Sequence, residues 1–148
     1  MRLNSSTHNN EGLIKKNDPE SMANTKRLNE KIIKHLDEYT FFDLDHQEYS
    51  EELIVSYGVS AEACKDVVIT LREENKKISF LNIKTLLPVA PEILEIINNY
   101  KKIIVVEENL NGIYSNILFG KNTPSNVKQV NKIGSLISPS EIIKVINS

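Results

Sequence analysis

The sequence has 148 residues, a formal net charge of −2 at pH 7, and 40% hydrophobic and 26% charged residues. This length suits one domain that buries roughly 68–70% of its unfolded surface without a metal or a disulfide. The charge is too small for a nucleic-acid binder, the apolar runs are too short to span a bilayer, and the single cysteine, Cys64, allows no internal disulfide. Residues 1–10 have no apolar core of the signal-peptide type, so we expect a cytoplasmic protein.

The first part of the chain predicts an arm and a helix. Residues 1–18 are polar and rich in Asn and Ser, and we expect an extended arm there. Asp18-Pro19-Glu20 is typical of a helix start. An amphipathic helix is expected over 19–38, with Leu28, Ile32, Ile33 and Leu36 on one face that docks on a body. Residues 39–148 are then the α/β domain.

Strand and helix patterns alternate from residue 41 onward. Apolar and acidic residues alternate at 41–45, which predicts an edge strand. Buried strands are expected at 53–57, 78–83 and 103–106, and a weaker one at 127–133. A helix is expected after each: one that Ser60 caps, one after Pro91, one over 111–119 that Gly120 ends, and one that starts with a capping box at 138–141. This alternation is typical of parallel strands with helices on both faces.

The loops at the carboxyl ends of the strands are where ligands bind in such a sheet. They contain no GxGxxG, GxxxxGK[ST] or GxSxG motif. The loop from Tyr57 to Ser60 has too few Ser, Thr and Gly for a flavin-phosphate site, and a plain turn into a helix is the favoured alternative. His8, His35 and His46 lack metal-ligand spacing. Cys64 lies on an apolar helical stripe, as a structural thiol does.

Glu107 and Glu108 follow the most apolar strand and are the most distinctive polar pair. They could act as a base, a metal ligand or an interface contact. Adjacent residues at a strand end point to opposite sides, which argues against a pair converging on one substrate. The structural alternative is a contact to a helix amino terminus or to a lysine. We therefore assign no catalytic, cofactor-binding or metal-binding residue.

Four stretches resemble the alpha subunits of 2-oxoacid:ferredoxin (2-oxoacid:acceptor) oxidoreductases, in their transketolase C-terminal-like region, domain II. Residues 53–60 are similar to the family's "LIVGWGS", 83–88 to "LRTLWPF", 105–112 to "VVEEN…G", and 2–8 to "RVTGLEH". Three positions differ from the family pattern: Ile113 replaces a common Gln, Asn9 replaces an acid, and Leu87 replaces an aromatic residue.

The resemblance implies a three-layer α/β/α fold with a five-stranded mixed sheet. Its strand order would be 1-3-2-4-5, with residues 41–45 as an antiparallel first strand. That order would bring the Gly58 loop beside the Glu107 loop. The residues expected to form a crevice and docking loops there are Tyr57, Gly58, Ser60, Glu107, Glu108, Asn109 and Gly112.

The resemblance also implies a place in a complex. Enzymes of this family decarboxylate a 2-oxo acid such as pyruvate on thiamine diphosphate, pass electrons through iron–sulfur clusters to ferredoxin, and form acyl-coenzyme A. The GDG…N motif and the cluster cysteines would lie elsewhere, so this chain itself would hold no thiamine diphosphate, magnesium, iron–sulfur cluster or coenzyme A. The expected partners are the pyrimidine-binding and diphosphate-binding subunits, ferredoxin indirectly, and as a further option a second copy, but neither nucleic acid nor a membrane.

The leading hypothesis is a structural and assembly domain, or a split small subunit, that is inactive alone. One alternative is the equivalent domain of a pyruvate dehydrogenase beta-type or transketolase-type enzyme. Another is a free-standing α/β module that binds a nucleotide or small anion between Gly58 and Glu107.

Overall fold

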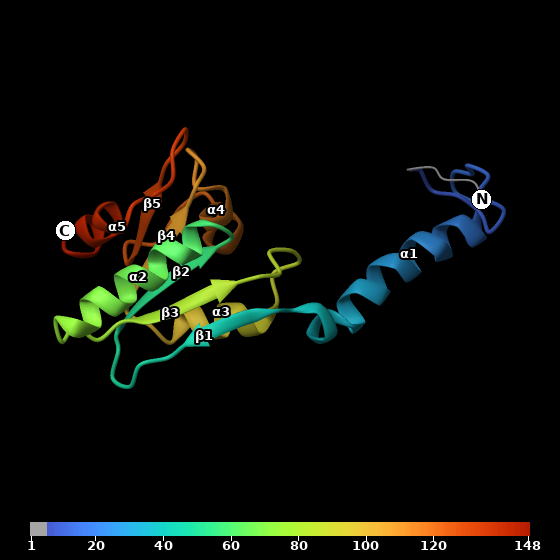
Figure 1. The fold of residues 1–148 in the computed structure, drawn as a ribbon. Coiled ribbons are helices and arrows are strands. Elements are labelled where there is room, and N and C mark those ends of the chain that lie inside the picture. Colours follow the sequence, from blue (N-terminus) through green and yellow to red (C-terminus); the bar gives the residue numbers. More distant parts are fainter. Residues whose placement is uncertain (1–5) are drawn as a thin grey trace. The chain divides into compact units, whose positions relative to one another are not determined.

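The computed structural model describes residues 6–148 and forms two units that divide after Tyr39. The first unit contains helix α1 (Pro19–Lys34) and the 3-10 helix η1 (Leu36–Tyr39). The second unit contains all the strands of the sheet and helices α2 to α5 (Figure 1).

Local hydrogen bonds start α1 where the sequence predicts. The carboxylate of Asp18 accepts bonds from the N–H of Ser21 at 3.1 Å and from its hydroxyl at 3.0 Å. Before α1, the described residues are not extended, because His8 and Ile14 form an antiparallel bridge around a turn. Residues 1–5 of the predicted arm lie outside the described residues.

Helix α1 is shorter than expected, since residues 36–39 form η1. The first unit itself leaves the apolar face of α1 uncovered: Leu28, Ile32 and Ile33 are 50%, 47% and 64% exposed. The docking expected for this helix is therefore not made within its own unit.

The sheet has the strand order β1-β3-β2-β4-β5. Strand β1 (Phe42–Asp45) runs antiparallel to β3 (Ser79–Ile83). Strand β2 (Glu52–Tyr57) is parallel to both β3 and β4 (Lys102–Glu107), and β4 is parallel to β5 (Val127–Asn131). The mixed sheet and the order expected from the family resemblance are confirmed.

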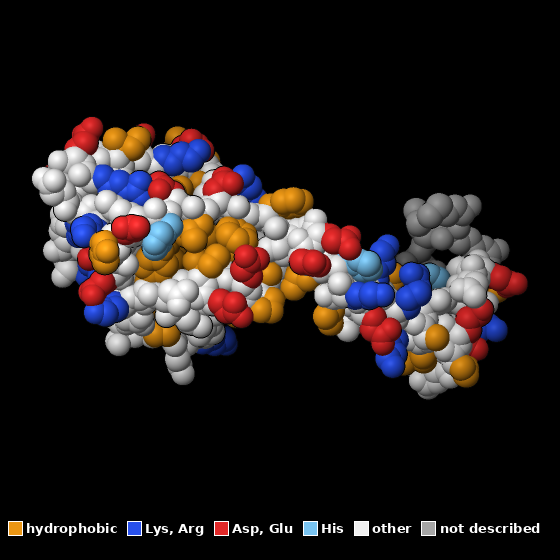
Figure 2. Space-filling view, turned by 90° about the horizontal axis from the view of Figure 1, so that it is seen from below, with side chains coloured by type: hydrophobic (Ala, Val, Ile, Leu, Met, Phe, Trp, Pro, Cys, Tyr) orange, Lys and Arg blue, Asp and Glu red, His pale blue; other side chains and the backbone are white. Residues whose placement is uncertain are grey.

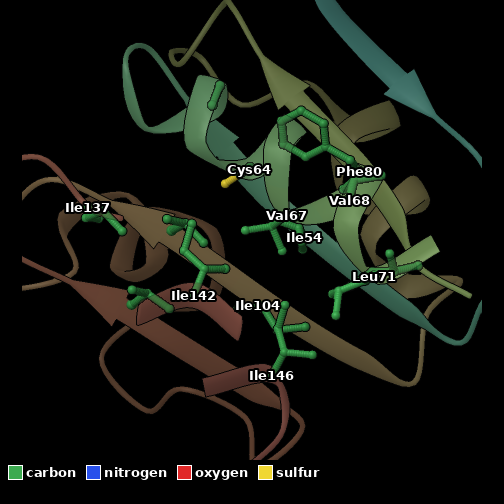
Figure 3. Packing of buried hydrophobic residues seen from close by; sticks show 14 residues of the cluster. Ile54, Cys64, Val67, Val68, Leu71, Phe80, Ile104, Ile137, Ile142 and Ile146 are labelled. Carbon is green, nitrogen blue, oxygen red and sulfur yellow. The ribbon is translucent and has the colours of Figure 1, made fainter. Parts of the chain in front are cut away.

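Helices cover both faces of the sheet, as expected (Figure 1). Helices α2 (Ser60–Glu73) and α5 (Pro139–Ile146) lie on one face, and α3 (Pro91–Asn98) and α4 (Ile113–Phe119) on the other. Figure 3 shows the core under α2 and α5, where Val67, Leu71 and Ile142 pack against Ile54 and Ile104 of the sheet.

Two local predictions need correction. Ser60 does not cap α2: it is the first residue of the helix, Val59 occupies the N-cap position, and no side chain caps this end. Ser60 is buried instead. The last strand ends at Asn131, two residues earlier than predicted, because the chain turns away toward α5. The capping box of α5 is present, with Glu141 accepting a 2.8 Å bond from the N–H of Ser138.

Candidate functional site

The carboxyl ends of β2 and β4 bring the two predicted loops together. Ser56 pairs with Val106 across these strands, so Tyr57 and Glu107 follow side by side. The hydroxyl of Tyr57 donates to Oε2 of Glu107 at 3.4 Å. The ring of Tyr57 also packs edge-on against that of Tyr114, with centroids 5.2 Å apart and planes at 67°.

The carboxylate of Glu107 is fully buried and holds the start of α4. It accepts the N–H of Tyr114 at 2.8 Å on Oε2 and the N–H of Ser115 at 3.0 Å on Oε1. These N–H groups lie in the first turn of the helix, which has no internal partner for them and carries partial positive charge. Glu107 is therefore committed to structure and is not positioned as an acid or base for a substrate.

Asn109 and Gly112 complete this capping arrangement. The amide nitrogen of Asn109 donates to Glu107, and its oxygen accepts the N–H of Ile113 at 2.8 Å. Gly112 has a φ of +58°, and a Cβ added to it would lie 2.5 Å from Oε1 of Gln129. A side chain at this position would therefore strain the backbone and push the end of the Gln129 side chain aside.

Glu108 points the other way, as the alternation of a strand predicts. Its Oε1 accepts the N–H of Ile137 at 3.2 Å, just before α5. The two adjacent acids thus bond to different segments: Glu107 to the start of α4, and Glu108 to the residues that lead into α5, and these two helices lie on opposite faces of the sheet (Figure 1). The sequence allowed several roles for Glu107. The structure shows it in contact with a helix amino terminus.

The two tyrosines of this cluster resist ionisation. Burial, and then the charge of Glu107, raise the pKa of Tyr57. Burial, followed by the neighbouring Tyr57 and Glu107, raises the pKa of Tyr114 to about 12. Neither phenol is therefore poised to give up a proton near neutral pH.

A hollow lies on the other side of Tyr57, toward β3. Its volume is about 370 Å³, and Tyr57, Gly58, Asn82, Ile83, Lys84 and Leu86 line it. The space between the Gly58 and Glu107 loops, where the sequence predicted a crevice, holds the bonded side chains of Tyr57 and Asn109. Asn82 and Lys84 were not selected from the sequence as residues that line a hollow. Their position at the carboxyl end of a predicted parallel strand is the signal that could have identified them.

Large apolar side chains are exposed along this edge. Each loop that leads from a parallel strand into its helix exposes at least one large hydrophobic side chain. These side chains, and that of Ile113 at the start of α4, are between 55% and 69% exposed. The loop residues are Val59, Leu87, Leu110, Ile133 and Leu136. Scattered apolar residues are normal on a surface. Here the parallel strands bring these side chains to one edge of the sheet.

Among the described residues, the donor set does not fit a metal cofactor. One cysteine cannot supply the thiolates of an iron–sulfur cluster, and burial raises the pKa of the Cys64 thiol to about 12. Within residues 6–148, no three His, Cys, Asp or Glu side chains gather as metal ligands. Within the same residues, no helix is long and apolar enough to cross a membrane.

Residues 50–142 match the family described as pyruvate:ferredoxin oxidoreductase core domain II. The match covers more than half of the chain, which therefore belongs to this family. The resemblance to 2-oxoacid:ferredoxin oxidoreductases is confirmed at the level of a subunit domain.

One curated relative is the 2-oxoglutarate synthase subunit KorA of Methanothermobacter marburgensis. It is 27% identical over 143 residues, which cover 95% of this chain and 38% of the relative. The 2-oxoglutarate:ferredoxin oxidoreductase of Magnetococcus marinus, solved with 2-oxoglutarate, coenzyme A and succinyl-CoA bound, has the same fold. That match has a TM-score of 0.75 and 21% identity, over 96% of this chain and 25% of the solved one. The chain thus spans well under half the length of either protein.

Proposed function

We propose that this chain is an assembly domain, or a small subunit, of a 2-oxoacid:ferredoxin oxidoreductase, and that it is inactive alone. The complete enzyme would oxidatively decarboxylate a 2-oxo acid on thiamine diphosphate, form acyl-coenzyme A and reduce ferredoxin. Magnesium, the iron–sulfur clusters and both organic cofactors would be bound by the pyrimidine-binding and diphosphate-binding partners. The cytoplasmic location expected from the sequence stays a prediction.

The apolar carboxyl edge of the sheet is the observation that carries this proposal. In an α/β domain with its own site, that edge converges polar groups on a ligand. Here the exposed side chains are Val59, Leu87, Leu110, Ile113, Ile133 and Leu136. A protein surface is the partner that such a set suits, because burying it removes apolar area from water.

The polar residues of the same edge support the proposal. Glu107 and Asn109 are bound to the start of α4, and Glu108 to the segment before α5. These bonds hold the loops in place and leave the apolar side chains as the contact surface. We therefore propose Tyr57, Gly58, Ser60, Glu107, Glu108, Asn109 and Gly112 as the scaffold of a docking edge.

The experiment is co-purification of the tagged chain with the other subunits encoded in its organism. A carboxyl-edge variant, Leu110→Asp with Leu136→Asp, should lower the amount of co-purified partner at least about tenfold, because each charge would be buried without a counterion. Ile69→Asp is the control, since Ile69 is 58% exposed on α2, outside the edge loops. Equal recovery of partners with both variants would contradict the proposal.

Activity gives a second readout. The isolated chain should not reduce a viologen dye with pyruvate or 2-oxoglutarate, whereas the co-purified complex should. Turnover by the chain alone would refute the proposal. Partners without iron–sulfur clusters would instead favour an enzyme of the pyruvate dehydrogenase or transketolase type.

The hollow beside Tyr57 favours one alternative function, a free-standing module for a small ligand. At about 370 Å³ it is large enough for a small molecule, and Lys84, which carries an amine, is one of its lining residues. That amine is already paired with Asp43 at 2.7 Å, which weakens it as an anion site. A thermal-shift titration with inorganic phosphate and with AMP tests this alternative, and saturable stabilisation would support it.

A further inference from the structure

Three cations form a stripe along α1. Arg27, Lys31 and Lys34 are spaced by four and three residues, so they lie on neighbouring turns of one side of the helix. All three are exposed, and within residues 6–148 none has an ion-pair or hydrogen-bond partner. In the second unit, basic residues such as Arg72 and Lys132 are paired with Asp45 and Glu141.

An uncovered apolar surface adjoins this cationic stripe. Met22, Leu28, Ile32 and Ile33 of α1 are 47–64% exposed. Leu28 and Ile32 also line a groove of about 450 Å³, together with Lys31, His35, Glu38 and Tyr39. Figure 2 shows basic and hydrophobic side chains exposed together on the smaller unit.

Neither feature stabilises the unit that carries it. Like charges at these spacings repel one another along a helix, and apolar side chains in water contribute nothing to a core. Both become favourable when a surface with an apolar centre and acidic flanks covers them. Glu30 lines the same hollow as the three cations, but its carboxylate lies 3.6 Å from Lys26, so this side of the helix keeps an excess of positive charge.

We propose that α1 is a docking helix for an acidic surface on another subunit of the same enzyme. The partner would place aliphatic side chains on Leu28 and Ile32 and carboxylates opposite Arg27, Lys31 and Lys34. This inference rests on the proposed function and adds a second interface, separate in the chain from the carboxyl edge of the sheet.

Other occupants fit less well. A second copy would offer two acids on its α1, Glu20 and Glu30, but Glu20 already accepts a bond from Asn10 and Glu30 is paired with Lys26. An anionic membrane would also attract the stripe, but helices that lie in a membrane interface typically insert Trp, Phe and Leu side chains. Helix α1 contains one Leu and no Trp or Phe.

The test compares two triple variants of the tagged full chain. The stripe variant carries Arg27→Glu, Lys31→Glu and Lys34→Glu. The control carries Lys16→Glu, Lys121→Glu and Lys144→Glu, which make the same charge change at exposed positions outside α1. We expect the stripe variant to recover at least about tenfold less partner subunit than the control at low salt, and wild-type recovery to fall as sodium chloride rises.

Hydrogen exchange of the wild-type chain gives a readout that does not depend on variants folding. The amides of α1 should exchange at least about tenfold more slowly in the complex than in the isolated chain. A complex that forms with α1 unprotected, or a stripe variant that recovers partner like the control, would overturn the inference and leave the proposed function standing. A wild-type chain that recovers no subunit would overturn both.

Three further outcomes would overturn the inference that α1 docks on another subunit. Protection of α1 in the isolated monomer would mean that the chain covers its own helix. A dimer in light scattering that the stripe variant abolishes would identify a second copy as the occupant. Binding of the isolated chain to phosphatidylserine vesicles but not to phosphatidylcholine vesicles, lost in the stripe variant, would identify a membrane.

Discussion

Glu107 and Glu108 are neighbours in the chain, yet Glu107 bonds to the start of α4 and Glu108 to the segment before α5. The sequence could predict that they point to opposite sides, because that follows from the geometry of a strand. It could not predict which one is buried, since that depends on α4 starting directly above Glu107. The missing signal lies in the spacing: Tyr114 and Ser115 come seven and eight residues after the acid, too far for a local capping motif.

Replacing Glu107 tests the role of its carboxylate. Glu107→Gln keeps the shape but turns an amide NH₂ toward an N–H of α4, so we expect a loss of about 2 kcal/mol in the free energy of unfolding. Glu108→Gln, at a half-buried site with one backbone bond, should lose under about 1 kcal/mol. Urea denaturation measures both. Equal losses would mean that Glu107 does not hold the helix.

The strands and helices were more predictable than the details of their ends. Periodicity predicted the four parallel strands and their helices, because burial on one or both faces leaves a pattern in the side chains. The strand order came only from the family resemblance, since pairing joins residues far apart in sequence, such as Val55 and Val105. Ser60 failed as a predicted cap because the turn at Gly58 brings it into the first turn of α2, where its side chain is buried.

The capping box of α5 should make stability depend on acid. A hydrogen bond from Lys132, then bonds from Ser138, lower the pKa of Glu141 to about 2 from 4.5. The folded state binds a proton on Glu141 less tightly than the unfolded state does. The contribution of this carboxylate to stability is therefore complete above about pH 4.5 and is lost as the pH falls toward 2. The thermal midpoint of wild type should exceed that of Glu141→Gln at pH 6, by a modest amount at this exposed site. The two midpoints should converge near pH 2, and a constant gap would contradict the assignment.

At the scale of the whole molecule, the hydrophobic core belongs to one unit. Every buried hydrophobic residue among those described lies between Leu53 and Ile146. The first unit contributes exposed side chains such as Ile14 and Ile33 instead. The sequence predicted a boundary between helix and domain near residue 39. It could not predict that the first unit lacks a hydrophobic core, because an amphipathic pattern shows that one face of a helix is apolar but does not show which surface covers that face.

Removal of residues 1–39 tests this division. The fragment 40–148 keeps the sheet and all the buried hydrophobic residues, so it should unfold cooperatively, with a thermal midpoint within about 5 °C of the full chain. Calorimetry or circular dichroism measures the transition. A fragment without a cooperative transition would show that the first unit contributes to the core.

Strand β1 limits how this domain can associate. It has only four residues, and its Asp43 and Asp45 are occupied by Lys84 and Arg72. A short edge strand with charged side chains is a poor template for adding a strand from another chain. Extension of the sheet from β1 into a neighbour, which is also the route to fibrous aggregation, is therefore disfavoured. At this edge of the sheet, assembly is left to loops and helix faces, whose side chains can discriminate between partners in a way that a backbone ladder cannot.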